Sequence, residues 1–496
     1  MSAPSHSRVG GNPLPKGWTQ TTLQFIADWG SGGTPSRKNS TYYSGEVPWI
    51  KTGDLGPRVL TSSSEFISEA GVQNSSAKYF PKGSVAIAMY GATIGKTSIL
   101  GIDATTNQAC GVGKPIDGVT TTDFLYYFLL NEKDNFIAKG KGGAQPNISQ
   151  ALIKDHDVLL PPLAEQKVIA DKLDHLLAQV ESTKARLDRI PNILKRFRQS
   201  VLAAAVSGKL TEEWRGKNKC SDIEITIQEI LESRSRLVSK RTQVPESHLV
   251  SDEYKIPLSW KWVSLDYLSS KIVDGVHHKP EYVESGIPFM SVKDINGGKI
   301  SFDYCKYISQ ATHEEIHPRC NPENGDLLIT KSGTIGRTAI VDVDVVFDLF
   351  VSVALIKPAS NKTNMKFIDI ALRQWVNSID VSSRIVGTAI KNLHLRDMRV
   401  LAIPFAPIEE QTEIVRRVEQ LFVHADKIEQ QVQQAQERVN KLTQSILAKA
   451  FRGELTEQWR KDNPDLISGE NSAEALLAKI KVERDAVKPK KKLKRK

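Results

Sequence analysis

The stretch GATIGKT, residues 91–97, carries the residue types of a nucleotide-binding phosphate loop. In such a loop, with the pattern G-x-x-x-x-G-K-[ST], backbone N–H groups hold phosphates, the lysine reaches the outer phosphates and the hydroxyl binds Mg²⁺. Gly95, Lys96 and Thr97 fit the end of this pattern, but its first glycine falls on Tyr90. Because loop length sets where the amides point, we expect no nucleotide site here. An ATP-dependent enzyme stays open as the alternative.

The sequence offers few residue patterns that are typical of other catalytic sites. We expect no catalytic zinc motif, no nucleophile elbow and no N-P-P-[YF] motif of an amino-methyltransferase. His277 and His278 are adjacent without a third ligand nearby, and the four cysteines do not have zinc spacing. Asp326 and Lys331 flank a predicted strand but lack the second carboxylate of a nuclease. We therefore expect no catalytic residue, no metal site and no cofactor in this chain.

Length and charge limit the number of domains and the kind of binding surface that the chain can have. A chain of 496 residues should hold more than one domain. Of its net charge of +10, seven positive charges come from the tail KPKKKLKRK (488–496), which leaves +3 for the rest, so any anion-binding surface must be local. The sequence has no apolar run that could span a membrane and no apolar signal segment at its start. We expect a cytoplasmic protein without membrane contact.

The chain repeats itself. SGKLTEEWR (207–215) recurs 245 residues later as RGELTEQWR (452–460), and the whole segment 163–215 matches 408–460 without a gap. Two shorter pairs also match: VPWIKTGDL (47–55) with IPFMSVKDI (287–295), and GATIGKTSI (91–99) with SGTIGRTAI (332–340). Arg337 replaces Lys96 in the last pair, so this segment is better interpreted as two strands around a tight turn.

The duplicated segments carry apolar residues at alternating steps of three and four, which is the heptad pattern of a coiled coil. Each helix of about 45 residues would extend ~65–70 Å at 1.5 Å per residue. We expect antiparallel pairing, because it brings the end of the first helix to the second variable region and gives the repeat a pseudo-twofold axis. The predicted core residues are Ile169, Leu173, Leu176, Val180, Leu187, Leu194, Ile414, Val418, Leu421, Ile428, Val432 and Leu442.

Local signals mark where these helices bend and end. Pro191 stands where the second copy has Gln436, so it should kink or locally break the first helix without ending the heptad register. Gly208 and Gly453 occupy the place of a helix-ending glycine. Two further amphipathic segments, 225–241 and 473–487, would either dock a partner protein or cover the ends of the helix pair.

The regions outside the helices alternate short β-branched and aromatic runs with Gly, Pro and Asn, which indicates an α+β fold of two globular α/β domains. The predicted order is a flexible N-terminus (1–12), a first α/β domain (13–158), a first helical region (159–215), a linker with a short helix (216–254), a second α/β domain (255–403), a second helical region (404–460), and a C-terminal helix with a basic tail (461–496).

Two polar loops lie at matching places in the two halves: GSGGTPSRKNSTYYSG (30–45) and DGVHHKPEYVESG (274–286). Arg and Lys can pair with guanine edges, and hydroxyl and amide groups can reach bases or phosphates. The two halves repeat the same scaffold, but their loops carry different polar residues. This difference favours a role in DNA recognition over the alternative that they are plain surface loops. The candidate DNA-binding residues are Ser36, Arg37, Lys38, Lys51, Lys96, His277, His278, Lys279, Lys293 and Arg337.

The chain closely resembles the specificity (S) subunit of Type I restriction–modification enzymes. The residues that carry the resemblance are GGTPSRKNSTYYSGEVPWIKTGDL (32–55), LPPLAEQKVIADKLD (160–174), LKRFRQSVLAAAVSGKLTEEWR (194–215) and QSILAKAFRGELTEQWR (444–460). The resemblance implies two target recognition domains on double-stranded DNA, two modification (methyltransferase) subunits and restriction subunits as partners. S-adenosylmethionine, ATP and Mg would belong to those partners. A coiled-coil scaffold without a DNA role stays open as a second alternative.

Two reading domains on a twofold-like frame predict a bipartite DNA target. Half-sites on one face of the duplex lie about one helical turn, or roughly 10 base pairs, apart. Because the two loops differ, the half-sites should differ and the target should be asymmetric.

Overall fold

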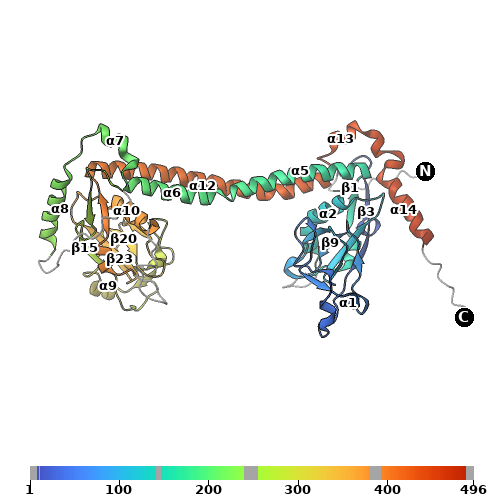
Figure 1. Cartoon of the computed structure of the whole chain (residues 1–496), viewed down its shortest axis with the longest axis horizontal. Helices are drawn as coiled ribbons and strands as arrows, with labels where there is room; N and C mark the ends of the chain where they lie inside the picture. Colours follow the sequence, from blue (N-terminus) through green and yellow to red (C-terminus); the bar gives the residue numbers. More distant parts are fainter. Residues whose placement is uncertain (1–7, 10–11, 141–146, 239–254, 379–392, 488–496) are drawn as a thin grey trace. The chain divides into compact units, whose positions relative to one another are not determined.

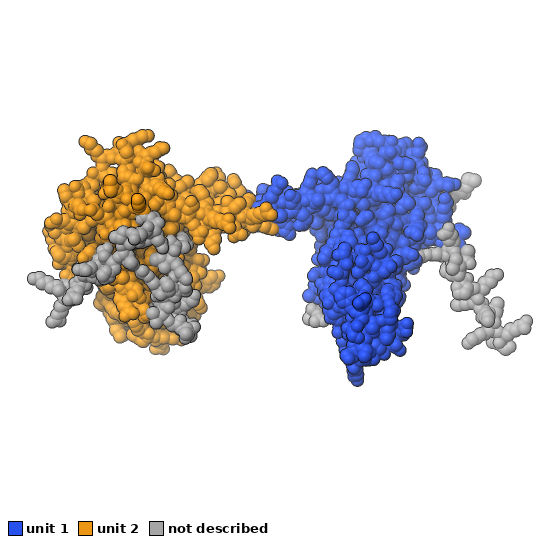
Figure 2. All heavy atoms as spheres, viewed as in Figure 1, with its two compact units in different colours: residues 1–187, 434–496 blue, residues 188–433 orange. Residues whose placement is uncertain are grey.

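The computed structural model describes residues 8–9, 12–140, 147–238, 255–378 and 393–487. The chain divides into two compact units, one of residues 1–187 with 434–496 and the other of residues 188–433, which Figure 2 distinguishes by colour. Each unit holds one α+β domain together with part of the long helices labelled in Figure 1. The described helices include none that is both long and apolar enough to cross a membrane. The basic tail 488–496 lies outside the described residues.

Two sheets build the domain of the first unit. A five-stranded sheet has the order β4-β12-β9-β10-β6, from β4 (Ala27–Ser31), β12 (Cys110–Pro115), β9 (Val85–Ala88), β10 (Thr97–Leu100) and β6 (Val59–Leu60). A four-stranded sheet has the order β7-β5-β11-β8, from β7 (Glu65–Ile67), β5 (Val47–Ile50), β11 (Ala104–Thr106) and β8 (Tyr79–Phe80). Helix α2 (Thr122–Asn131) buries Phe124, Leu125 and Phe128 in a core shared with β9 and β10.

The second unit repeats this plan with fewer strands. One sheet has the order β15-β23-β20-β21, from β15 (Ser269–Asp274), β23 (Val353–Pro358), β20 (Leu327–Thr330) and β21 (Thr338–Ile340). The other has the order β19-β16-β22, from β19 (Lys306–Ile308), β16 (Ile287–Met290) and β22 (Asp348–Leu349). Helix α10 (Met365–Ser378) buries Phe367, Ile368 and Leu372 in the same core as β20 and β23. The predicted α+β class is confirmed for both domains.

An antiparallel strand pair joins the beginning and end of each domain. The pairs are β3 (Thr19–Thr22) with β13 (Asp157–Leu160), and β14 (Lys261–Ser264) with β24 (Ala402–Phe405). A long helix follows directly after β13 and after β24. Within the expected flexible N-terminus, β1 (Arg8–Val9) pairs with β2 (Asn12–Pro13).

The long helices are α5 (Leu163–Leu187), α6 (Ile190–Val206) and α12 (Ile408–Phe451). Pro191 lies in the first turn of α6, so the first copy is locally broken, whereas α12 runs unbroken for 44 residues. Proline fits this position because the first turn of a helix needs no donor from its N–H. Of the two predicted outcomes, a kink or a local break, the structure shows the local break.

Contacts inside each unit show that the helices pair antiparallel. In the first unit Lys172 Nζ donates to the carbonyl of Leu455 at 2.7 Å, and Leu173 shares a core with Leu447. The start of α5 therefore lies beside the end of α12.

In the second unit Val201 and Leu202 of α6 share a core with Ile414 and Val418 of α12. The end of α6 therefore lies beside the start of α12. Both pairings confirm the antiparallel coiled coil.

A buried glutamate at the start of α5 ties the first domain to both helices. Glu165 has no exposed surface, and its carboxylate accepts hydrogen bonds from Trp18 Nε1 at 2.9 Å and Thr456 Oγ1 at 2.6 Å. Arg460 donates to the same carboxylate at 2.5 Å. Trp18 immediately precedes β3 in the first domain, while Thr456 and Arg460 follow α12, so segments far apart in the sequence meet on one side chain.

The second unit builds the same junction from the matching residues. Glu410, also fully buried, accepts hydrogen bonds from Trp260 Nε1 at 2.8 Å and Thr211 Oγ1 at 2.7 Å. Arg215 donates to this carboxylate at 3.0 Å. Each glutamate therefore takes its Thr and Arg from the other repeat, which is what a pseudo-twofold tandem duplication produces.

The predicted helix-ending glycines are confirmed. Gly208 and Gly453 follow α6 and α12 with φ of +73° and +75°, a conformation that favours glycine. A Cβ atom would also lie 2.4 Å from Pro257 at Gly208 and 2.8 Å from Pro15 at Gly453.

One predicted core residue is wrong. Leu442 is 44% exposed, whereas Leu447 is fully buried. From Val418 to Val439 the buried positions of α12 follow steps of seven: Val418, Ala425, Val432 and Val439. The next buried position comes eight residues later at Leu447, so the seam leaves the heptad register after Val439 and turns Leu442 outward. The other predicted core residues are buried, except that Leu176, Leu187, Leu421 and Ile428 are half-buried.

The two short amphipathic helices each cover a domain. Helix α8 (Ile223–Leu237) buries Ile230, and its Arg234 donates to Asp266 at 2.6 Å. Helix α14 (Ala473–Val487) buries Leu477 in the core of the first unit. The predicted segment 473–487 coincides with α14, and residues 239–241 of the other predicted segment lie outside the described residues.

Candidate nucleic-acid interface

Four strands of the first domain bring a polar loop and a tight turn to one end of their sheet. Ser31 pairs with Gly111, Cys110 pairs with Ala88, and β10 begins beside β9. Residues 32–46, which contain most of the first polar loop (30–45), leave from the end of β4, and residues 89–96 join β9 to β10. Both segments therefore lie at the same sheet end.

The stretch at residues 91–97 is a hairpin turn and not a phosphate loop. A single 3-10 turn, Gly91–Thr93, connects antiparallel strands, and no helix follows it to hold phosphates at its N-terminus. Thr97 is 3% exposed and donates its hydroxyl to the carbonyl of Gly95, so it is not free to bind Mg²⁺. Lys96 is exposed on the turn.

One carboxylate joins two of the predicted cations of the first domain. Arg37 and Lys51 donate to the two oxygens of Glu65 at 2.7 Å and 2.6 Å. The hydrogen bonds from Lys51 and from Arg37 hold the pKa of Glu65 below its usual value. The Arg37 guanidinium also lies 4.1 Å from the ring centre of Tyr43. Arg37 is thus fixed in place while 57% of its side chain stays exposed.

The other candidates of the first polar loop are free of such restraint. Ser36 and Lys38 are exposed, and so is Lys96 on the nearby turn. Among the described residues, neither Lys38 nor Lys96 has a carboxylate within ion-pair distance. Such lysines can contact phosphates without first breaking an internal pair.

In the second domain a buried aspartate anchors the second polar loop (residues 275–286). Asp274, the last residue of β15, pairs with Lys331 at 3.0 Å, His277 at 3.1 Å and Arg319 at 2.9 Å. Burial raises the pKa of Asp274, but hydrogen bonds from Lys331 and His277 outweigh this and hold it below the usual value. The loop is therefore tied at its base to the turn after β20.

The remaining candidates of the second domain differ in exposure. His278, Lys279 and Lys293 are exposed, and Lys279 Nζ lies 5.4 Å from the ring centre of Tyr282. Arg337 is only partly exposed, and its guanidinium donates to the carbonyl of Ile295 at 3.4 Å. Lys96 and Arg337 match in the repeat, but Arg337 braces its hairpin while Lys96 points to solvent.

Asp326 and Lys331 do not form a nuclease-like pair. Asp326 pairs with Lys357 at 2.6 Å, whereas Lys331 pairs with Asp274. Asp326 and Lys331 thus form ion pairs with other residues, one at each end of β20, and not with each other.

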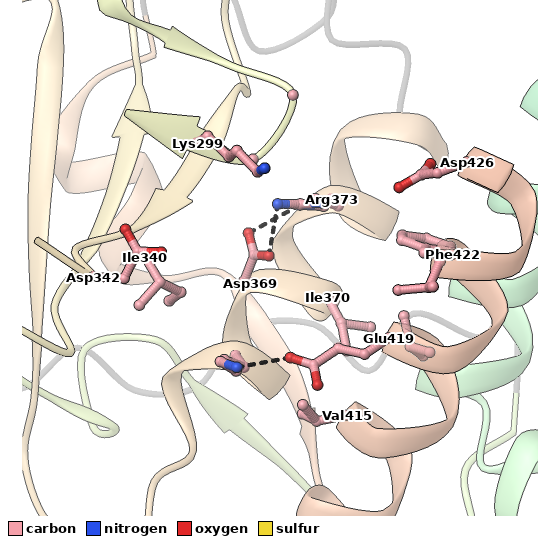
Figure 3. A pocket seen from close by; sticks show the side chains of 15 residues that line it. Lys299, Ile340, Asp342, Asp369, Ile370, Arg373, Val415, Glu419, Phe422 and Asp426 are labelled. Carbon is pink, nitrogen blue, oxygen red and sulfur yellow. Dashed lines mark hydrogen bonds and ion pairs between the residues drawn. The ribbon is translucent and has the colours of Figure 1, made fainter. Parts of the chain in front are cut away.

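A pocket of about 460 Å³ opens in the second unit between α10, α12 and the turn at Gly297 and Gly298 (Figure 3). Four of its charged side chains form two ion pairs: Arg373 with Asp369 at 2.9 Å, and Lys366 with Glu419 at 2.7 Å. None of the predicted DNA-binding residues lines it. The candidate interface is therefore the loop-bearing end of each sheet and not this pocket.

The expectation of no zinc-type motif is wrong, whereas the expectation of no metal site stays a prediction that the structure does not test. Residues 313–317 read His-Glu-Glu-Ile-His, which is the H-E-x-x-H spacing. His313 and His317 converge on Asp348, and one possible ligand atom from each of the three residues lies within 4.8 Å of the others. The two-histidine spacing was visible in the sequence, whereas the partnership with Asp348 depends on the fold.

The comparisons with known proteins agree with this architecture. The family model of the Type I restriction modification DNA specificity domain matches residues 15–192 and 276–438. The EcoBI specificity subunit of Escherichia coli is 42% identical over 73% of this chain and 72% of its own length. The EcoKI specificity subunit of Escherichia coli strain K12 is 32% identical over 95% of this chain and 97% of its own length.

Solved structures share the fold at low sequence identity. The HsdS subunit from Thermoanaerobacter tengcongensis has a TM-score of 0.55 and 17% identity, over 90% of this chain and 99% of its own. A chain from a structure of complex assembly and conformational transition of the type I R-M system has a TM-score of 0.59 and 16% identity, over 89% of this chain and all of its own. With two segments that match the specificity-domain model and relatives that are 32% and 42% identical over 95% and 73% of the chain, the chain belongs to the family of Type I restriction–modification specificity subunits.

Proposed function

We propose that this chain reads the DNA target of a Type I restriction–modification complex and contributes no catalytic group of its own. The observation that carries the proposal is that the two halves share their helix–domain junction but differ in the polar residues of their loops. Glu165 and Glu410 sit in matching junctions, yet the first polar loop is anchored through Glu65 and the second through Asp274. Domains that share a frame and differ in their exposed donors are suited to reading different base sequences.

The charge arrangement supports reading rather than catalysis. Arg37 is exposed but oriented by Glu65 and Tyr43, which suits bidentate contact with a guanine edge. Lys38, Lys96, Lys279 and Lys293 are exposed without an ion partner among the described residues, which suits phosphate contact. S-adenosylmethionine, ATP and Mg are then supplied by the partner subunits, and the target is asymmetric and bipartite.

The long helices offer two equivalent surfaces to modification subunits. Phe197 and Leu442 are separated by the repeat offset of 245 residues, and both are exposed, by 36% and 44%. Each belongs to a different unit. Apolar side chains exposed at matching places of a repeat favour two copies of one partner, because each copy would bury the same kind of patch.

The test exchanges residues 13–155 for the matching domain of a relative and expresses the chimaera with its modification and restriction subunits. Mapping N6-methylated adenines across a host genome should show one half of the target changed and the other unchanged. Exchange of residues 255–400 should change only the second half. A palindromic native target, or a simultaneous change of both halves, would contradict independent reading domains.

A further inference from the structure

Helix α9 (Gln310–Ile316) presents two histidines to a buried carboxylate of the neighbouring strand. His313 and His317 are one helical turn apart, and their ring centres are 4.5 Å apart. Asp348 begins β22, and its side chain is only 2% exposed. Its two oxygens lie 2.6 Å from His313 Nδ1 and 2.9 Å from His317 Nδ1.

Asp348 lacks the permanent cation that several other buried aspartates of this unit have. Its ion-pair partners among the described residues are these two histidines, with neither Lys nor Arg. The contrasting aspartates are Asp266, Asp274, Asp326 and Asp369, each of which faces Lys or Arg. The groups that face Asp348 are thus two imidazoles, which are metal ligands as well as hydrogen-bonding partners.

We propose that His313, His317 and Asp348 bind one divalent transition-metal ion of the zinc class, and that this ion braces the second polar loop. Two imidazole nitrogens and one carboxylate oxygen are ligands that Zn²⁺ takes in proteins at about 2.0–2.2 Å. A tetrahedral ion with such bonds needs ligand atoms roughly 3.3 Å apart. The three atoms already lie within 4.8 Å of one another, so small side-chain rotations would close the site.

The arrangement supports metal binding and not hydrolysis. In zinc hydrolases with the H-E-x-x-H spacing, the glutamate acts as general base. Here Glu314 is exposed and accepts a hydrogen bond from Gln310 at 3.0 Å. Among the described residues, the hydrogen-bond partner of Glu314 is Gln310, which is not one of the three ligand residues.

The position of the site links it to the second polar loop, and this part of the inference rests on the proposed function. Ile316, between the two histidines, shares a buried cluster with Val276 and Phe289. Val276 opens the second polar loop beyond Asp274, and its N–H donates to the carbonyl of Leu349 at 3.0 Å. The start of the second polar loop thus contacts both α9, through Ile316, and β22, through Leu349. An ion that joins α9 to Asp348 of β22 would hold these two elements together and so brace the loop.

The positions of the first domain that match His313 and Asp348 hold other residues, so this domain serves as an internal control. Helix α1 (Glu69–Gln73) has the capping serine that matches α9, but Val72 stands where α9 has His313. Thr105, which pairs with β5 as Asp348 pairs with β16, is buried and donates to the carbonyl of Pro48. Metal should thus affect the second domain alone.

The direct test measures zinc on the full-length chain without DNA or partner subunits, so it does not depend on the proposed function. Chain stripped with chelator, dialysed against Zn²⁺ and analysed for metal should retain one ion. His313→Gln and His317→Gln should weaken binding at least about 100-fold. The control, a His277→Gln and His278→Gln double variant, changes a neighbouring histidine pair and should retain the ion. Zinc retention that is absent in the native chain, or equal in His313→Gln, would overturn the site.

Hydrogen exchange tests the bracing role and reports on folding of the variants. Zinc should slow amide exchange in residues 275–286 and in α9 of the native chain, and should leave residues 32–46 unchanged. The His317→Gln variant should show the native pattern without zinc and no response to it. An ion that binds at one per chain without slowing residues 275–286 would overturn the bracing.

Discussion

Arg460 donates a hydrogen bond to the buried carboxylate of Glu165 across 295 residues of sequence, and Arg215 does the same for Glu410 in the other unit. The two pairs join the end of one repeat to the start of the other. They make each domain dependent on both copies of the duplicated helix.

Replacement of Glu165 by Ala should destabilise the first unit by about 3–5 kcal/mol, because Arg460 would remain largely buried without its partner. Urea unfolding followed by regional hydrogen exchange should locate the loss in residues 12–187 and 434–487. The matched Glu410→Ala should place the loss in residues 188–433. As a surface control, Glu457→Gln removes an exposed pair with Lys461 and should leave the midpoint unchanged. Equal effects of Glu165→Ala and Glu457→Gln would contradict the structural role of the junction.

Leu173→Asp and Leu442→Asp should separate the true helix seam from its predicted extension. Leu173 is fully buried, so a charge there costs several kcal/mol, whereas Leu442 is 44% exposed and should tolerate Asp with little change. Circular dichroism during thermal unfolding measures both. A similar loss of thermal stability in both variants would show that Leu442 belongs to the buried helix seam.

The same Leu442→Asp variant, combined with Phe197→Asp, should fold and yet lose association with modification subunits. Each single variant should lose one of two partners, which mass measurement of the assembled complex can count. A double variant that still binds two subunits would show that the partners contact another surface.

The anchor at Asp274 predicts an acid-sensitive second unit. The folded pKa of Asp274 lies below its ordinary value, so its contribution to stability is full above the ordinary aspartate pKa and is lost as pH falls through the folded pKa. Native and Asp274→Asn chains should therefore differ most in unfolding midpoint near neutral pH and converge in acid. The Asp274→Asn substitution would also leave Lys331, which is 5% exposed, without its carboxylate partner. A difference that stays constant from neutral to acid pH would contradict this account.

Lys38→Ala and Lys96→Ala should each weaken DNA binding by the assembled complex and reduce the slope of log affinity against log salt by about one. Both side chains are exposed and unpaired among the described residues. Arg337→Ala is the matched control, because its guanidinium donates to a carbonyl of its own domain. Fluorescence anisotropy over a salt series measures all three. An unchanged slope for both lysine variants would remove these residues from the phosphate surface.

Much of this architecture is determined by local sequence. The heptads, Pro191 and the two glycines predict the helices, their break and their ends, because these features act within a few residues, and the 245-residue repeat predicts that the plan occurs twice. The segment 91–97 could be excluded as a phosphate loop from spacing alone, and its matching copy predicted the strand–turn–strand that the structure shows.

Only the tertiary structure decided which polar groups are free and which are paired. Glu65 forms ion pairs with Arg37 and Lys51, and β7, which begins at Glu65, lies beside β5. The guanidinium of Arg337 donates to the carbonyl of Ile295, 42 residues away in the sequence. Leu442 turned outward because the seam shifts register, which a strict heptad count does not anticipate. Asp348 meets His313 and His317 because β22 pairs with β16 and the side chain of Asp348 lies within hydrogen-bond distance of both histidines. Such contacts depend on strand pairing between distant segments, and no local pattern encodes their partners.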